Sequence, residues 1–175
     1  GRPCIPGYAY SCDMAHLLAE SPLGILTIAS NGSAITGIWY EHHRYPPTAE
    51  TLGERVEPGA DPVLDAAATQ LTEYLAGERA SFDLPLDPAC TEKQKAVWDV
   101  LCRIPAGQSR TYGEIAHELG NPNAAQAVGQ AVGHNPVSII IPCRRVMGAD
   151  GSVTGDAGGV ERKSFLLELE GYRSA

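Results

Sequence analysis

The stretch NPVSIIIPCRRV, residues 135–146, joins an apolar run to a cysteine that is followed by two arginines. The run from Val137 to Ile141 has the composition of a buried strand, and such a strand does not usually end on a thiol beside two fixed cations. Nearby cations increase the thiolate fraction of a cysteine, and the thiolate is the nucleophile. A buried structural cysteine is the common alternative. The neighbouring arginines favour a nucleophilic role for Cys143.

The chain has 175 residues, a net charge of −8 and five cysteines. This length allows one domain or two small ones. No apolar run reaches the roughly 20 residues that span a bilayer, and the first residues lack the apolar segment of a signal peptide. An odd number of cysteines without a CxxC pair indicates a reducing compartment. We therefore expect a cytoplasmic monomer without a disulfide framework, a bound metal or a cofactor.

The first half of the chain predicts an α/β unit. Short apolar segments with β-branched residues predict strands over 16–20, 24–30 and 34–41, with a tight turn at Asn31-Gly32. The polar stretch 42–60 predicts a loop. Asp61-Pro62 predicts the start of a helix that Gly77 ends. The extended residues 80–89 then connect two domains, which we place at 1–86 and 87–175.

The second half predicts short helices. Thr91 and Gln94 form a capping box before a helix that stops at Pro105. Two further helices, over 111–119 and 124–132, flank a turn at 120–122 and together predict a helix-turn-helix, a shape that can enter a DNA groove. A last helix covers 160–171. The fold class is an α/β half followed by a mainly helical half.

These segments resemble the O6-alkylguanine-DNA alkyltransferases, the methylated-DNA–protein-cysteine methyltransferases. The similarity includes TYGEIAHELGNPNAAQAVGQAVGHNP at 111–136, the Pro-Cys box at 142–146 and the closing helix that ends LELEG at 167–171. SPLG at 21–24 and TEKQKAVWDVL at 91–101 also fit. The resemblance covers nearly the whole chain. It implies a ribonuclease H-like N-terminal half and a winged-helix-like C-terminal half that carries the reactive cysteine.

The resemblance also implies roles for single residues. In that family a cysteine takes the alkyl group from a flipped-out O6-alkylguanine, and the protein is consumed in one turnover. Cys143 matches the alkyl acceptor, and Asn135 matches the hinge asparagine that orders the site. Tyr112 matches the tyrosine that donates a proton to the departing guanine, and Glu170 matches the acid that ends a proton relay. Thiolate attack with a donor for the leaving group is sound chemistry.

The residue after the cysteine departs from the family pattern. A histidine there passes the thiol proton toward the glutamate, and this chain has Arg144. Arginine cannot accept a proton at ordinary pH. The change removes a general base and substitutes a static charge, for which Glu170 is a plausible ion-pair partner.

Further departures lie on the substrate side. Gln126 stands where the family has an arginine that fills the gap left by the flipped base, and Ser138 replaces a pocket proline. In the glycine-rich loop, Asp156 replaces a tyrosine, and its neighbour Ala157 would also line the pocket. Each change alone is compatible with neutral drift. Together they indicate an altered substrate site.

The charge pattern points in the same direction. No lysine or arginine lies between Arg110 and Arg144, an interval that contains the whole predicted recognition helix. Cations supply most of the affinity of DNA-binding surfaces by releasing counterions, although backbone amides and hydroxyls also contact phosphates. DNA binding is therefore expected to be weakened.

These observations leave three hypotheses. The first, which the sequence alone favours, is a repurposed family member whose Cys143 attacks an alkylated or electrophilic small molecule in biosynthesis or self-protection. The second is single-turnover DNA repair at O6-alkylguanine. The third is a non-catalytic lesion binder, which ranks last because such proteins lose the cysteine. A fold does not by itself decide a substrate.

Overall fold

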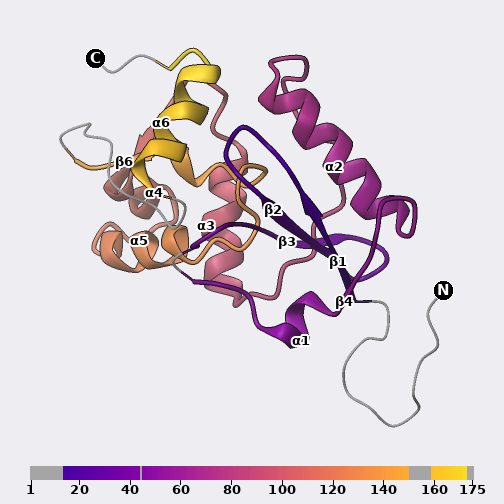
Figure 1. Ribbon diagram of the computed structural model, residues 1–175. Coiled ribbons are helices and arrows are strands. Elements are labelled where there is room, and N and C mark those ends of the chain that lie inside the picture. Colours follow the sequence, from indigo (N-terminus) through magenta and orange to yellow (C-terminus); the bar gives the residue numbers. More distant parts are fainter. Residues whose placement is uncertain (1–13, 44, 150–158, 173–175) are drawn as a thin grey trace, which may run out of the picture. The chain divides into compact units, whose positions relative to one another are not determined.

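The computed structural model describes residues 14–43, 45–149 and 159–172, and the chain forms two compact units, residues 1–89 and 90–175. Figure 1 shows their elements. The first unit contains β1 (Ala15–Ala19), β2 (Leu26–Ser30), β3 (Ile35–Tyr40), α1 (Ala49–Leu52), β4 (Glu54–Arg55) and α2 (Pro62–Leu75). The second contains α3 (Glu92–Cys102), β5 (Arg110–Thr111), α4 (Tyr112–Glu118), α5 (Ala125–Gly133), the 3-10 helix η1 (Cys143–Arg145), β6 (Val146–Met147) and α6 (Val160–Leu169).

The first unit is a sheet of order β3-β2-β1-β4 with α2 packed against it. β1, β2 and β3 are antiparallel neighbours, and their register places Leu17, Ile28 and Ile38 side by side in the core. The predicted strands and the predicted helix after Asp61 are confirmed. The prediction of a loop over 42–60 was wrong in part, because α1 and β4 lie there and β4 pairs in parallel with β1. Elements of four and two residues are too short to show a periodic pattern.

Asp61 joins α2 to the sheet. Its Oδ1 accepts hydrogen bonds from the amides of Val63 and Leu64, which caps the helix, and its Oδ2 accepts a 2.8 Å bond from the hydroxyl of Ser30. Both Asp61 and Ser30 are buried. A single carboxylate therefore satisfies the first turn of the helix and the end of β2 together.

In the second unit the predicted helices α3, α4, α5 and α6 are all confirmed. Thr91 and Thr111 each form a complete capping box, with Gln94 and Glu114 respectively. The indole of Trp98 donates a 2.9 Å hydrogen bond to the carbonyl of Ala131, which fixes α3 against α5. None of the helices in the described ranges has the length and apolar composition needed to cross a bilayer.

The apolar run 137–141 is not the strand that its composition suggests. It forms turns, and the pairing that follows it is the two-residue parallel ladder of β5 with β6, Arg110 opposite Val146 and Thr111 opposite Met147. α4 follows β5 directly, and β6 follows η1 directly. The pairing of β5 with β6 therefore brings the start of α4 close to the end of η1. The sequence gives no periodic signal for strands of two residues.

The joint at Asp61 can be tested by substitution. Asp61→Ala should lower the free energy of unfolding by about 2 kcal/mol, because it removes a helix cap and leaves the buried Ser30 hydroxyl without its acceptor. Asp61→Asn should retain most of the stability, since its amide oxygen still accepts from the helix. Urea unfolding followed by circular dichroism measures both. Equal midpoints for Asp61→Ala and the wild type would contradict this account.

Candidate active site

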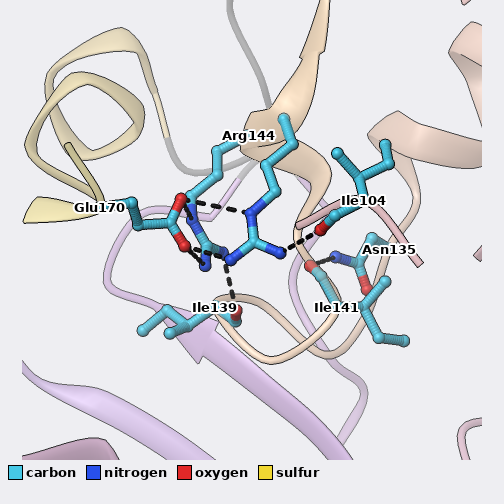
Figure 2. A network of polar contacts seen from close by, with 7 residues as sticks. Ile104, Asn135, Ile139, Ile141, Arg144 and Glu170 are labelled. Atoms are coloured by element: carbon cyan, nitrogen blue, oxygen red, sulfur yellow. Dashed lines mark hydrogen bonds and ion pairs between the residues drawn. The ribbon is translucent and has the colours of Figure 1, made fainter. Parts of the chain in front are cut away.

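The segment that leads to Cys143 is held by the side chain of Asn135. Its Oδ1 accepts a 2.9 Å hydrogen bond from the amide of Val137, and its Nδ2 donates a 2.8 Å bond to the carbonyl of Ile141. The amide of Ile141 also donates to the carbonyl of Val137. Asn135 is buried, and Figure 2 shows its amide directed at Ile141. The side chain therefore closes residues 135–141 into a compact loop.

Ile139 has an unusual backbone conformation at the centre of this loop. Its φ is 73°, in the left-handed region, and its side chain is buried. For a β-branched residue this conformation costs about 1–3 kcal/mol and persists only where surrounding contacts enforce it. This turn is the physical reason why the run cannot be a strand.

Cys143 begins η1 directly after Pro142. Its amide donates a 2.9 Å hydrogen bond to the carbonyl of Ile141, and the residue is partly exposed. The thiol is thus borne on a short rigid turn and is not part of the fully buried core. This is a suitable position for a nucleophile that must meet a substrate.

Arg144 and Glu170 form the predicted ion pair, which is confirmed. Nε of Arg144 donates to Oε1 of Glu170 at 3.1 Å and Nη2 donates to Oε2 at 2.7 Å, a bidentate arrangement. Both side chains are 2% exposed. The remaining Nη1 donates a 2.7 Å bond to the carbonyl of Ile139 (Figure 2). One guanidinium thus ties the residue after the thiol to α6 and to the strained turn.

Arg145 is a site residue that the sequence reasoning did not select. Its Nε and Nη2 also donate to the two carboxylate oxygens of Glu170, and its Nη1 donates a 2.6 Å bond to the carbonyl of Ile104. Glu170 therefore accepts hydrogen bonds from two buried arginines at both oxygens. The paired arginines after Cys143 were the available signal, but adjacency alone does not reveal a shared acceptor.

Lys163 makes a further connection between α6 and this region. It is 1% exposed, and its ammonium donates a 2.8 Å hydrogen bond to the carbonyl of Val146. Together, Lys163 and Glu170 fix α6 to the residues that follow Cys143. The sequence showed a lysine on a helix with an apolar face, and a lysine in that setting is ordinarily solvated.

The remaining predicted site residues are placed differently. Tyr112 opens α4, and its ring lies against α5 close to Gly129. Gln126 is exposed on α5, and Ser138 is buried within the loop before Cys143. Asp156 and Ala157 lie outside the described residues. The hydrogen bonds described above link Asn135, Cys143, Arg144 and Glu170 through the carbonyls of Ile139 and Ile141, and they do not include Gln126.

A cavity of about 490 Å³ lies between α3 and α5. Its walls are mainly apolar, with Lys93, Gln130 and His134 among the polar lining residues. None of the predicted site residues within the described ranges lines it. It is separate from the loop that carries the thiol.

Cys102, at the end of α3, provides a thiol for comparison with Cys143. Desolvation raises its pKa, and the charge of Asp99 raises it further, although Arg145 and Arg103 oppose the shift. A raised pKa lowers the thiolate fraction at neutral pH. Cys102 is therefore a weak nucleophile in spite of its exposure.

Because the carboxylate of Glu170 is buried between two arginines, removing its charge should strongly destabilise the protein. Glu170→Gln should lower the free energy of unfolding by about 3–5 kcal/mol, because two buried guanidinium groups lose their counter-charge. Glu168→Gln, at an exposed position of the same helix, is the matched control and should change stability by less than about 0.5 kcal/mol. Urea denaturation measures both variants. Similar values for the two would show that Glu170 does not hold the site together.

The sequence matches known protein families and relatives along nearly its whole length. The profile described as the ribonuclease-like domain of 6-O-methylguanine DNA methyltransferase matches residues 14–88, and the profile of its DNA binding domain matches 92–172. A methylated-DNA–protein-cysteine methyltransferase of Mycobacterium bovis is 46% identical over 155 residues, which are 89% of this chain and 91% of that protein. The corresponding protein of Methanosarcina acetivorans is 43% identical over 158 residues, 90% of this chain and 99% of the relative.

A solved structure gives the same result. The crystal structure of Mycobacterium tuberculosis OGT in complex with DNA superposes with a TM-score of 0.82 at 43% identity, covering 90% of this chain and 93% of that one. The α/β first unit and the mainly helical second unit are those of the fold expected from the sequence, and the resemblance is confirmed. The chain belongs to the O6-methylguanine DNA methyltransferase family, a family of alkyl-transferring proteins.

Proposed function

We propose that this protein removes alkyl groups from O6-alkylguanine in DNA by transferring them to Cys143. The observation that carries the proposal is similarity along nearly the whole chain to methylated-DNA–protein-cysteine methyltransferases and to a relative solved with DNA. The small-molecule substrate that the sequence departures favoured has no support among these relatives. The second of the three hypotheses therefore replaces the first.

The proposed chemistry is a direct displacement. The Cys143 thiolate attacks the alkyl carbon, a sulfur–carbon bond forms, and the carbon–O6 bond breaks with its electron pair moving to the guanine. Tyr112 is proposed to donate a proton as the guanine departs, and Asn135 to keep the loop before the thiol in its reactive shape. Ser138, Asp156 and Ala157 are proposed to line the pocket that receives the base.

The distribution of charge is compatible with a DNA substrate. Residues 1–89 contain four lysines and arginines and twelve acidic residues, whereas residues 90–175 contain nine of each. All of the excess negative charge therefore belongs to the first unit. The unit with the helix-turn-helix is neutral overall, so electrostatic repulsion of phosphates by its net charge is not expected.

The surface of α5 is unusual for a DNA-binding helix. Its exposed residues include Gln126, Ala127 and Gln130, none of them charged. Among the described residues of this unit, the exposed cations are Lys93 and Lys95 on α3 and Arg103 directly after it. We propose that backbone amides and side-chain amides of α5 contact the DNA. The affinity for DNA should therefore fall only slightly as the salt concentration rises.

Alkyl transfer can be detected by intact-protein mass spectrometry after incubation with duplex DNA that contains O6-methylguanine. The wild type and Cys102→Ala should each gain one methyl group, because Cys102 is a poor nucleophile. Cys143→Ala should gain none. A wild type that stays unmodified, while iodoacetamide still alkylates Cys143, would overturn the proposed DNA substrate.

The absence of lysine and arginine from α5 gives a second prediction. Gln126→Arg should tighten binding to duplex DNA and steepen the slope of log affinity against log salt by about one, because one more counterion is released. Gln126→Ala is the matched control and should leave that slope unchanged. Fluorescence anisotropy at several salt concentrations measures both. Identical slopes for Gln126→Arg and the control would show that α5 stays away from the phosphates.

A further inference from the structure

The loop before Cys143 contains a conformation that needs an external restraint. Ile139 is left-handed at φ 73°, and its carbonyl accepts the 2.7 Å hydrogen bond from Nη1 of Arg144. Asn135 restrains the loop at Val137 and Ile141, on either side of the strained residue. Arg144 therefore makes the side-chain contact to the carbonyl of the strained residue itself, and it does so from the position next to the nucleophile.

The guanidinium of Arg144 also donates two hydrogen bonds to the carboxylate of Glu170. Both carboxylate oxygens of Glu170 accept from Arg144 and from Arg145, so the positions at which the carboxylate could take up a proton are filled by fixed donors. An arginine does not release a proton at ordinary pH and cannot receive one. Neither member of the Arg144–Glu170 pair is suited to accept the proton of the thiol.

We infer that Arg144 is a positioning residue that holds the Ile139 turn and Glu170 in place, and that the Cys143 proton leaves to solvent without passing to Glu170. This inference rests on the proposed alkyl transfer. The thiol first loses its proton to water or buffer. The thiolate then forms the sulfur–carbon bond, the carbon–O6 bond breaks, and the departing guanine takes a proton from Tyr112 or water.

The pH dependence of Cys143 reactivity distinguishes this route from a carboxylate base. The elements packed against η1 are α6 and α3. Their charged or titratable groups include Lys163 on α6, Glu170 directly after it, Asp99 and Cys102 on α3 and Arg103 directly after that helix, beside Arg144 and Arg145 of η1 itself. Desolvation raises the pKa of Cys102, and peptide mass mapping separates its modification from that of Cys143. The profile at Cys143 can therefore be read for that thiol alone.

The first experiment measures the rate of iodoacetamide alkylation at Cys143 between about pH 3 and pH 9.5, a range that includes the ordinary pKa values of carboxylates and thiols. The wild-type rate should rise through one titration, that of the thiol. Arg144→His should add an inflection near the ordinary imidazole pKa of about 6.5, because it introduces a base beside the thiol. A wild-type inflection in the range of carboxylates, about pH 4–5, would show that Glu170 takes the proton and would overturn the inference.

The second experiment tests the positioning role through a double-mutant cycle. Arg144→Lys keeps the charge but loses the planar fork, and should slow alkyl transfer from DNA about tenfold with DNA affinity nearly unchanged. Ile139→Gly adopts a left-handed conformation freely but also removes a buried side chain, so its own rate is the reference. In that background Arg144→Lys should slow alkyl transfer much less than tenfold. A double variant as slow as the product of the two single effects would overturn the positioning role.

The two proposals fail in different ways. If the wild type takes no methyl group from DNA, the proposed function fails. The cycle is then measured with iodoacetamide as the electrophile, and positive coupling still supports the role of Arg144. If the wild type does react with DNA but the cycle shows no coupling, only the role of Arg144 is lost.

Discussion

The structure around Cys143 depends on one interaction, the hydrogen bonds that the buried guanidinium groups of Arg144 and Arg145 both donate to the carboxylate of Glu170. A buried charge is tolerated only when it is paired and its remaining hydrogen-bonding groups are satisfied. Here the spare donors of Arg144 and Arg145 reach the carbonyls of Ile139 and Ile104. The two arginines and Glu170 thus connect the end of α6, the strained loop and the segment that follows α3.

This arrangement explains how an arginine can stand directly after Cys143. Its planar fork binds the carboxylate at two points and still has a donor for the backbone of Ile139. A histidine has only two ring nitrogens and could not make these three contacts. The turn after Cys143 is therefore held at three points by Arg144. Under the proposed mechanism, alkyl transfer depends on thiolate that is already present.

Much of the fold follows from local sequence signals. Capping residues and apolar spacing locate α2 and α3, and short apolar segments with β-branched residues locate β1 to β3. The Arg144–Glu170 pair followed from the resemblance, which places Arg144 where the family has a histidine and Glu170 at the acid of the same relay. Other features needed three dimensions: the second arginine on Glu170, the link from Lys163 to Val146, and the β5–β6 ladder. Ile139 shows the limit most clearly, because an apolar β-branched run predicts a strand while its hydrogen-bonding partners impose a turn.

The substrate was the least predictable part, because altered residues near a site do not say what enters it. The most direct test compares methyl transfer to Cys143 from O6-methylguanine in duplex DNA with transfer from the free nucleobase, as second-order rate constants. We predict that the duplex reacts faster by at least about tenfold, since contacts remote from the alkyl group contribute to the transition state. Equal rates, or a faster reaction of the free base, would contradict a DNA substrate and favour a small molecule.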